Sequence, residues 1–258
     1  MTKTALITGA SSGIGAEFAR IHAQRGGDLV IVARREDRLN ALRDELVAAH
    51  NVSVHVLASD LNDEAAPQQI FDWVQAQNIE IDYLINNAGF GGRGKFHERD
   101  WAADRSMIQV NIVALTALSR LFLPGFVARN SGRILNVSST ASLMPGPLQA
   151  VYYATKAYVT FLGNALAEEL HDTNVTVTSL MPGATESEFA ATSDMDKTDL
   201  FSKTASARSV AKDGYEAMLK GQLDVISGVP MSQRMMLGMV PLMPKKMLLK
   251  QIRQMQEV

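Results

Sequence analysis

Short β-branched runs alternate with longer helical patterns along most of this chain of 258 residues. Most of the runs are continuously apolar, as in strands that are buried on both faces. The runs cover 5–8, 29–33, 52–57, 83–86, 133–137, 175–180 and 224–226, and the helical patterns cover 13–25, 36–49, 64–77, 101–129, 150–172 and 207–221. Strand–helix alternation requires right-handed crossovers, so the sequence predicts an α/β fold with one doubly wound parallel sheet of about seven strands and helices on both faces.

The composition excludes several classes of function. With a net charge of −2, the chain has no overall attraction for nucleic acid or an acidic membrane. It has no cysteine, and its five histidines are scattered without ligand-like spacing, so we expect no disulfide and no metal. The first apolar run begins almost at Met1, and no apolar run approaches the roughly 20 residues of a membrane span. We therefore expect a cytoplasmic protein with a single domain over 1–258.

Two segments interrupt the alternation. Residues 184–206 are polar and irregular, which predicts a mobile lid over a substrate. Residues 230–258 hold seven of the thirteen methionines and predict a C-terminal helical extension with an adaptable apolar surface. Within it, Lys245, Lys246, Lys250 and Arg253 alternate with apolar residues and indicate a basic amphipathic helix. Such a helix can be a lid, a subunit contact or a surface anchor, and we do not expect membrane contact.

A glycine-rich turn joins the first run to the first helical pattern. Gly9, Gly13 and Gly15 are spaced G-x-x-x-G-x-G. Glycine permits close backbone approach and unusual dihedrals, and a helix N-terminus attracts phosphate, so this context predicts a dinucleotide site. The alternative is a tight turn without a ligand. The candidate binding residues of the turn are Gly9, Ser11, Ser12, Gly13, Ile14 and Gly15.

The end of the second run indicates which dinucleotide binds. A carboxylate at this point would bond the adenosine ribose and repel a 2′-phosphate, but the chain has Ala33 there. Arg34 follows and can pair bidentately with a 2′-phosphate, which favours NADP over NAD. Alternatively, Arg34 and Arg35 simply begin a solvated helix with Glu36 and Asp37.

A hydroxyl, a phenol and an ammonium are spaced so that they can meet. Tyr152 and Lys156 are four residues apart and share one face of a helix. Ser139 closes the apolar run that precedes that helix. These groups can polarise a carbonyl and give it a proton, and with the phosphate site they predict hydride transfer to and from a nicotinamide. Tyr153 is a rival for Tyr152, but only Tyr152 has a lysine four residues on.

Together these residues resemble the short-chain dehydrogenase/reductase family, and the resemblance runs from Thr4 to about Val229. It implies a Rossmann-type fold and the catalytic set Asn111, Ser139, Tyr152 and Lys156. It implies further cofactor contacts at Asp60, Leu61, Asn87, Ala88, Gly89, Tyr152, Lys156, Pro182, Gly183, Thr185 and Ser187. One residue departs from the pattern: NADP-using relatives often carry a basic residue where this chain has Ser12, so Arg34 would do most of the discrimination.

The resemblance also implies roles for these residues. We expect the Lys156 ammonium to lower the pKa of Tyr152, Ser139 to donate to the substrate oxygen, and Asn111 to position a water beside Lys156. Apolar residues around the site, such as Leu143, Met144, Pro145 and Phe189, indicate an apolar ketone or aldehyde of small to medium size.

The function expected from the sequence is NADP(H)-dependent interconversion of a carbonyl and an alcohol by a homodimer or homotetramer, that is, a carbonyl reductase. The alternatives are an NAD(H)-dependent alcohol dehydrogenase of the same fold and a non-catalytic regulator that senses the nucleotide. An intact set of catalytic residues argues against the regulator, because a sensor needs only the phosphate site.

Overall fold

The computed structural model of the chain describes residues 2–193, 195 and 204–257. Within these residues, parallel strands form one 7-stranded sheet in the order β3-β2-β1-β4-β5-β6-β7. The strands are β1 (Thr4–Thr8), β2 (Asp28–Ala33), β3 (Val54–Ala58), β4 (Tyr83–Asn86), β5 (Gly132–Val137), β6 (Val175–Pro182) and β7 (Asp224–Ser227). The sheet predicted from the sequence is confirmed, with strand ends that shift by one or two residues.

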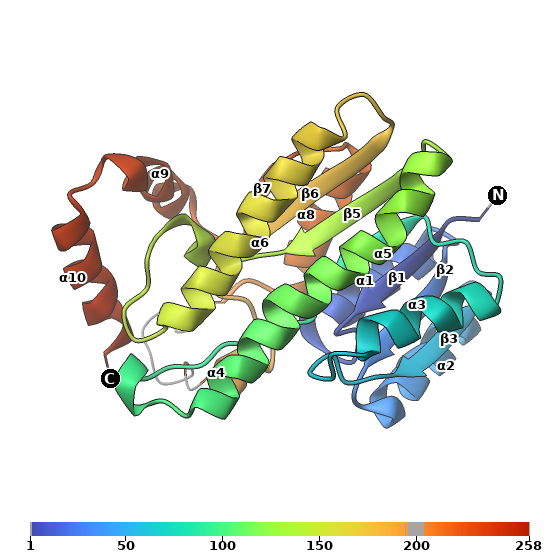
Figure 1. The fold of residues 1–258 in the computed structure, drawn as a ribbon, viewed down its shortest axis with the longest axis horizontal. Helices are drawn as coiled ribbons and strands as arrows, with labels where there is room; N and C mark the ends of the chain where they lie inside the picture. The colour runs from blue at the N-terminus through green and yellow to red at the C-terminus, as the bar shows by residue number, and fades with distance from the viewer. Residues whose placement is uncertain (1, 194, 196–203, 258) are drawn as a thin grey trace.

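Helices cover both faces of the sheet (Figure 1). One face packs against α1 (Gly13–Gln24), α2 (Glu36–His50) and α8 (Ala207–Leu219), and the other against α3 (Ala66–Ala76), α5 (Leu115–Ala128) and α6 (Ala150–Glu169). In β1, Leu6 belongs to one core and Ile7 to the other, and both are fully buried. Burial on both faces explains why the strands read as continuous apolar runs.

The other elements lie at the carboxyl ends of the strands or beyond the last strand. They are η1 (Phe96–Glu98), α4 (Trp101–Ile108), the π-helical turn η2 (Gln109–Ala114), η3 (Thr140–Leu143), α7 (Phe189–Thr192), α9 (Met231–Met239), η5 (Val240–Leu242) and α10 (Lys245–Gln256). In Figure 1, α9 and α10 form a separate arm at the side of the molecule away from α2 and β3. The predicted helical extension over 230–258 therefore consists of α9, η5 and α10.

The helical stretch Trp101–Ala128 is the one helix among the described residues that is long and apolar enough to cross a membrane, with a mean hydropathy of 1.7. The expectation that no segment reaches that length is wrong by this measure. The stretch nevertheless packs in the protein core, where Leu118, Phe122 and Phe126 are buried against the sheet and α3. Length and composition alone do not separate such a core helix from a membrane span.

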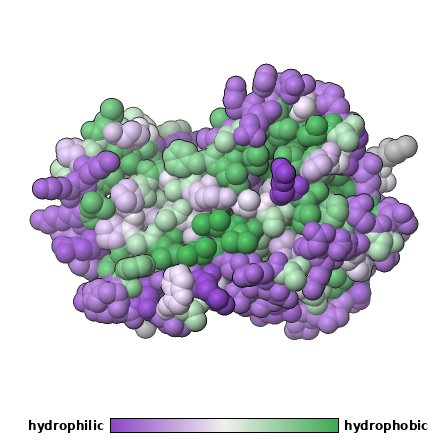
Figure 2. Space-filling view, in the orientation of Figure 1, coloured by the Kyte–Doolittle hydropathy of each residue, from purple (hydrophilic) through white to green (hydrophobic). Residues whose placement is uncertain are grey.

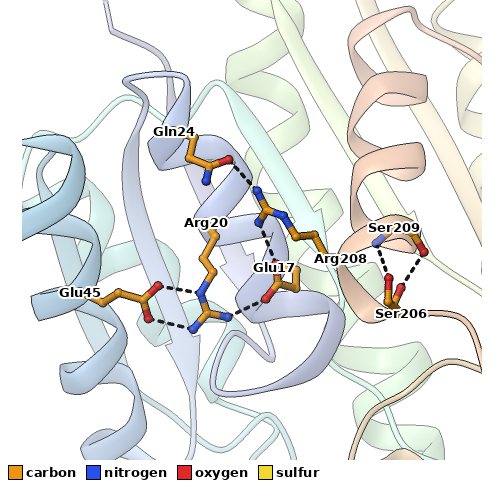
Figure 3. A network of polar contacts seen from close by, with 7 residues as sticks. All are labelled: Glu17, Arg20, Gln24, Glu45, Ser206, Arg208 and Ser209. Carbon is orange, nitrogen blue, oxygen red and sulfur yellow. Dashed lines mark hydrogen bonds and ion pairs between the residues drawn. The ribbon is translucent and has the colours of Figure 1, made fainter.

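A network of ion pairs ties the helices on the first face together (Figure 3). The Arg20 guanidinium of α1 pairs with Glu45 of α2 at 2.7 Å and with Glu17 at 2.7 Å. Arg208 of α8 donates to the other oxygen of Glu17 at 2.9 Å and to Gln24 at 2.8 Å. These contacts lie on the outer surface and join helices that carry no predicted site residue beyond the glycine turn, so their role is to hold the layer in register.

Candidate cofactor and active site

A cavity of about 500 Å³ opens at the carboxyl ends of the parallel strands. It lies beside β1, where the strand order reverses: β2 and β3 extend the sheet on one side of β1, and β4 begins the other side. Folds of this kind bind ligands at such a reversal. Its walls include every site residue predicted from the sequence except Gly15 and Asn111, which pack behind the wall. The structure therefore brings the glycine-rich turn and the catalytic trio to one cavity.

The glycine-rich turn is shaped for close backbone approach. Gly9 and Gly13 have φ angles of 67° and 54°, in the left-handed region where other residues are strained. A Cβ atom on Gly15 would lie 2.4 Å from the carbonyl oxygen of Gly9 and 2.5 Å from Nδ2 of Asn87. The turn thus leaves backbone and space exposed at the N-terminus of α1, and these residues fit a dinucleotide pyrophosphate.

One hydroxyl joins the glycine turn to the segment after β4. The Thr8 Oγ1 accepts hydrogen bonds from the backbone N–H groups of Asn87 and Ala88, each at 3.0 Å. The Asn87 side chain in turn donates to the carbonyl oxygen of Thr8 at 2.9 Å. Thr8 ends the first strand, where the glycine-rich turn begins. The sequence did not show that its hydroxyl holds the segment after β4.

Tyr152 and Lys156 are buried side by side on α6. Burial raises the pKa of Tyr152 above its usual range, and a hydrogen bond with the Ser139 side chain opposes that rise. Burial also lowers the pKa of Lys156 to about 8, so that the lysine keeps most of its charge at neutral pH. Ser139 ends the segment after β5 and caps η3, accepting from the N–H of Ala141 at 3.1 Å.

The net shift in the pKa of Tyr152 is upward because of burial, the opposite of the fall expected from Lys156. The Lys156 Nζ donates to the carbonyl oxygen of Val137 at 2.9 Å and lies 5.8 Å from the centroid of the Tyr152 ring. At that separation the loss of solvent around the phenol outweighs the attraction of the ammonium. Tyr152 is thus held as a neutral phenol, which is the form that can give up a proton.

Asn111 lies in the π-helical turn between α4 and α5. Its Nδ2 donates to the carbonyl oxygen of Phe90 at 2.9 Å and to Oγ1 of Thr155 at 3.0 Å, and its Oδ1 accepts from the Phe90 N–H at 3.1 Å. The sequence predicted one regular helix over 101–129, so this π-helical turn, a feature often found at functional sites, was not expected. A Cβ atom on Gly89 would lie 3.1 Å from Asn111 Oδ1 and 3.3 Å from Lys156 Nζ, so Gly89 lets these groups approach. The water that Asn111 was expected to position stays a prediction.

At the far end of the cavity, the arginine that makes the defined contacts is Arg35. Arg34 is exposed and lines the cavity. The Arg35 guanidinium donates to the hydroxyls of Ser11 and Ser12 at 3.0 and 2.9 Å. Arg35 was interpreted only as part of a solvated helix start, because a sequence does not show which way adjacent arginines point. Nearby, the Asp60 carboxylate accepts from the Asn62 N–H at 3.0 Å, and the Leu61 side chain is buried in the core.

The described part of the predicted lid folds over the glycine turn. Residues 194 and 196–203 of the lid lie outside the described residues. Thr185 donates to the carbonyl oxygen of Gly183 at 3.0 Å, and a Cβ atom on Gly13 would lie 3.0 Å from the Ser187 Cβ. The Phe189 ring lies over Tyr152, with ring centroids 5.3 Å apart. The segment therefore contacts both ends of the cavity.

The last turn of α10 inserts a polar side chain beside the active site. Gln256 is fully buried; its Nε2 donates to the Tyr153 hydroxyl at 2.9 Å, and its Oε1 accepts from Nε2 of Gln149 at 3.2 Å. Arg93 donates to the Gln256 carbonyl oxygen at 2.8 Å. Tyr153, the rival phenol, is thus occupied with the C-terminal arm, and burial raises its pKa to about 12. Sequence reasoning missed Gln149 and Gln256, because two glutamines about a hundred residues apart give no signal.

The fold and cavity define a dinucleotide-binding domain of the Rossmann type, and comparisons with known proteins identify the family. The short chain dehydrogenase family model matches residues 3–198. A short chain dehydrogenase of Pseudocercospora fijiensis is 36% identical over 194 residues, which are 74% of this chain and 62% of that protein. The NADP-dependent 3-hydroxy acid dehydrogenase YdfG of Salmonella typhi is 39% identical over 69% of this chain and 71% of its own.

A solved structure agrees along nearly the whole chain. The short-chain dehydrogenase from Sphingobium yanoikuyae in complex with NADPH has a TM-score of 0.83 and 33% sequence identity, and the match covers 90% of each chain. The chain spans about three fifths of the length of the first curated relative, so that protein carries sequence without a counterpart in the alignment. This protein belongs to the short-chain dehydrogenase/reductase family.

Proposed function

We propose that this protein is an NADP(H)-dependent oxidoreductase that interconverts a carbonyl and an alcohol on an apolar substrate of small to medium size. The observation that carries the proposal is that the buried Tyr152 and Lys156 and the half-buried Ser139 share the wall of a cavity that continues to the glycine turn. The preference for NADP is supported by Arg34 and Arg35 at the adenosine end, by the absence of a carboxylate at Ala33, and by the NADP named for two similar proteins.

Each residue has a physical task in this proposal. A bound nicotinamide supplies or accepts the hydride. Ser139 donates a hydrogen bond to the substrate oxygen where negative charge develops, and Tyr152 gives that oxygen its proton in the reducing direction. Burial disfavours the Tyr152 phenolate, and the buried Lys156 ammonium, 5.8 Å from the centroid of the ring, offsets part of that cost once the proton has left.

The character of the substrate is inferred from the walls. Phe90, Phe189 and Met195 line the large cavity near Tyr152. A smaller cavity of about 60 Å³ lies between η3 and the C-terminal arm, lined mainly by methionine, leucine, isoleucine and valine side chains. It shares Thr140, Ala141 and Tyr153 with the large one, so a bulky apolar group could extend from Tyr152 toward α10.

Binding and turnover measurements test this function. Fluorescence titration with NADPH and NADH should give a lower Kd for NADPH, and a panel of graded ketones, aldehydes and alcohols should change absorbance of the reduced nicotinamide. NADH binding with the lower Kd would favour the NAD(H)-dependent alternative. Tight nucleotide binding with no turnover across the panel would favour the regulator.

A homodimer or homotetramer is proposed as the assembly. Figure 2 shows apolar side chains gathered in the middle of the face that α5 and α6 form. On α6, Phe161 is 72% exposed and Tyr158 is also exposed, as is Val113 in η2. Contiguous apolar surface of this kind marks protein contacts. Sedimentation of the wild-type protein and of Phe161→Glu should show a loss of assembly in the variant; a monomeric wild-type protein would contradict the proposal.

A further inference from the structure

A carboxylate from the predicted lid segment, that of Glu188, lines the adenosine end of the cavity. Glu188 precedes α7, and its Oε2 pairs with Nη1 of Arg35 at 2.8 Å. Its Oε1 pairs with Nη1 of Arg38. These arginines hold the pKa of the Glu188 carboxyl below its usual range, with a further hydrogen bond from Ser12. The carboxylate therefore stays ionised and bridges the lid to the start of α2.

Arg35 and Arg38 form an anion-binding site, and the anion that occupies it is the Glu188 carboxylate of the same chain. Arg35 occupies the N-cap position of α2, and its side chain donates to the hydroxyls of Ser11 and Ser12. Ser11, Ser12, Arg34, Arg35 and Glu188 all line the cofactor cavity. Guanidinium groups bind carboxylates and phosphates with the same fork geometry, so the groups that hold Glu188 are equally suited to a phosphate monoester.

We propose that Glu188 competes with the 2′-phosphate of NADP for Arg35 and Arg38, and so sets how strongly this chain prefers NADP over NAD. The inference rests on the proposed function. A phosphate that reaches these arginines must displace the carboxylate, and the two anions repel each other while both remain close. NAD carries a hydroxyl at that position and does not need the arginines. The carboxylate thus lowers affinity for NADP and leaves affinity for NAD nearly unchanged.

The competition also reaches the active site. Glu188 is followed directly by Phe189, whose ring covers Tyr152 at a centroid distance of 5.3 Å. On the other side, Ser187 lies against Gly13 of the phosphate turn. Displacing Glu188 therefore releases the residue that anchors this short segment at the cavity rim, between the phosphate turn and the catalytic phenol.

Cofactor fragments test the proposal without catalysis. Isothermal titration calorimetry would measure the Kd of adenosine 2′,5′-bisphosphate and of AMP for the wild-type protein and for Glu188→Gln. Exposed ion pairs are individually weak, so removing two should tighten bisphosphate binding by between about twofold and about thirtyfold. The Kd of AMP should change less than about twofold, because AMP lacks the 2′-phosphate.

Glu186→Gln is the matched control. It removes the same charge two residues away, from an exposed position on the same segment. It should leave both Kd values within about twofold of wild type. An equal gain in Glu186→Gln would show a general charge effect and overturn the proposal. Unchanged or weaker bisphosphate binding in Glu188→Gln would also overturn it, since Glu188 would then be inert or would position Arg35 for the phosphate.

A double-mutant cycle separates competition from simple repulsion. In a background of Arg35→Gln and Arg38→Gln, the gain from Glu188→Gln should vanish, because neither arginine that pairs with Glu188 remains. A gain that persists in full would overturn the proposed competition. If the wild-type protein binds neither the bisphosphate nor NADPH, the proposed function itself fails; if it binds both but ignores Glu188→Gln, only this inference fails.

Discussion

The cofactor half and the substrate half of the cavity differ in what shapes them: backbone geometry shapes the first, and side chains shape the second. The phosphate-binding part of the cofactor half depends on backbone geometry, namely the glycine φ angles and the strand ends, which the Thr8 hydroxyl holds in place. The substrate half is made of side chains on short or peripheral elements, such as Phe189 on α7 and Gln256 at the end of α10. A backbone site tolerates almost no added atom, whereas a side-chain site can be reshaped one residue at a time. The first half therefore defines the reaction, and the second adapts it to a substrate.

The largest expected effect lies where the halves meet. Tyr152→Phe removes the proton donor and almost no volume, so turnover should fall at least about a hundredfold while the NADPH Kd stays unchanged. Tyr153→Phe is the control, because its hydroxyl only accepts from Gln256. Steady-state kinetics with fluorescence titration measures both. Full activity of Tyr152→Phe together with loss in Tyr153→Phe would reverse the assignment.

Adding one methyl group to the backbone site should damage cofactor binding. In Gly15→Ala the new Cβ would lie 2.4 Å from the Gly9 carbonyl oxygen, so we expect destabilisation by about 1–3 kcal/mol and at least tenfold weaker NADPH binding. The same change at Gly238 in α9 meets nothing within 4 Å among the described atoms and should stabilise the helix by about 0.5–1 kcal/mol. Denaturant unfolding and NADPH titration compare Gly15→Ala with Gly238→Ala. Equal changes in stability and NADPH affinity would contradict the contrast between the cofactor half and the C-terminal arm.

The buried lysine gives a pH dependence of stability. The pKa of Lys156 is about 8 in the folded protein, below its ordinary value of 10.5. The folded state thus loses this proton first, and the contribution of Lys156 to the free energy of unfolding should rise between pH 8 and 10, by about 2 kcal/mol. Denaturant unfolding of wild type against Lys156→Met isolates this contribution. A difference that is flat over this range would mean that Lys156 is not desolvated.

The smallest effect is expected on the substrate side. Gln256→Ala leaves the Tyr153 hydroxyl and Gln149 without their buried partner, at a cost of about 1–3 kcal/mol in the packing of α10. The KM for bulky ketones should rise several-fold, with kcat for small ketones and the NADPH Kd unchanged. Gln254→Ala, at an exposed position on the same helix, serves as the control. Weaker NADPH binding in Gln256→Ala would show that the halves are not independent.

The sequence predicted the backbone half well because its signals are local. Glycine spacing, strand runs and the four-residue step from Tyr152 to Lys156 depend on a few neighbouring residues, and the cavity brings these groups together as expected. The π-helical turn at Asn111 was not predicted, because the bonds of its amide reach Phe90, which lies 21 residues away in the sequence.

What could not be predicted depends on residues far apart in the sequence. The pKa of Tyr152 was expected to fall because charge spacing is visible in a sequence, whereas desolvation appears only when the surrounding elements are packed. The pairing of Glu188 with Arg35 and the insertion of Gln256 beside Tyr153 both join segments more than 100 residues apart. No local sequence pattern predicts either of these two contacts.

The hydrogen bonds of the Thr8 hydroxyl affect when the cofactor site is completed during folding. Thr8 and Asn87 are 79 residues apart. During synthesis, β4 therefore becomes available to pair with β1 only after β2 and β3 have been synthesised. Contacts between distant residues form slowly, because the intervening loop must be closed first. During synthesis from the N-terminus, the glycine turn therefore emerges early but stays incomplete until β4 docks beside β1. A dinucleotide can then stabilise only folding intermediates in which this central strand pair exists, so added cofactor should slow unfolding more than it speeds the first steps of folding.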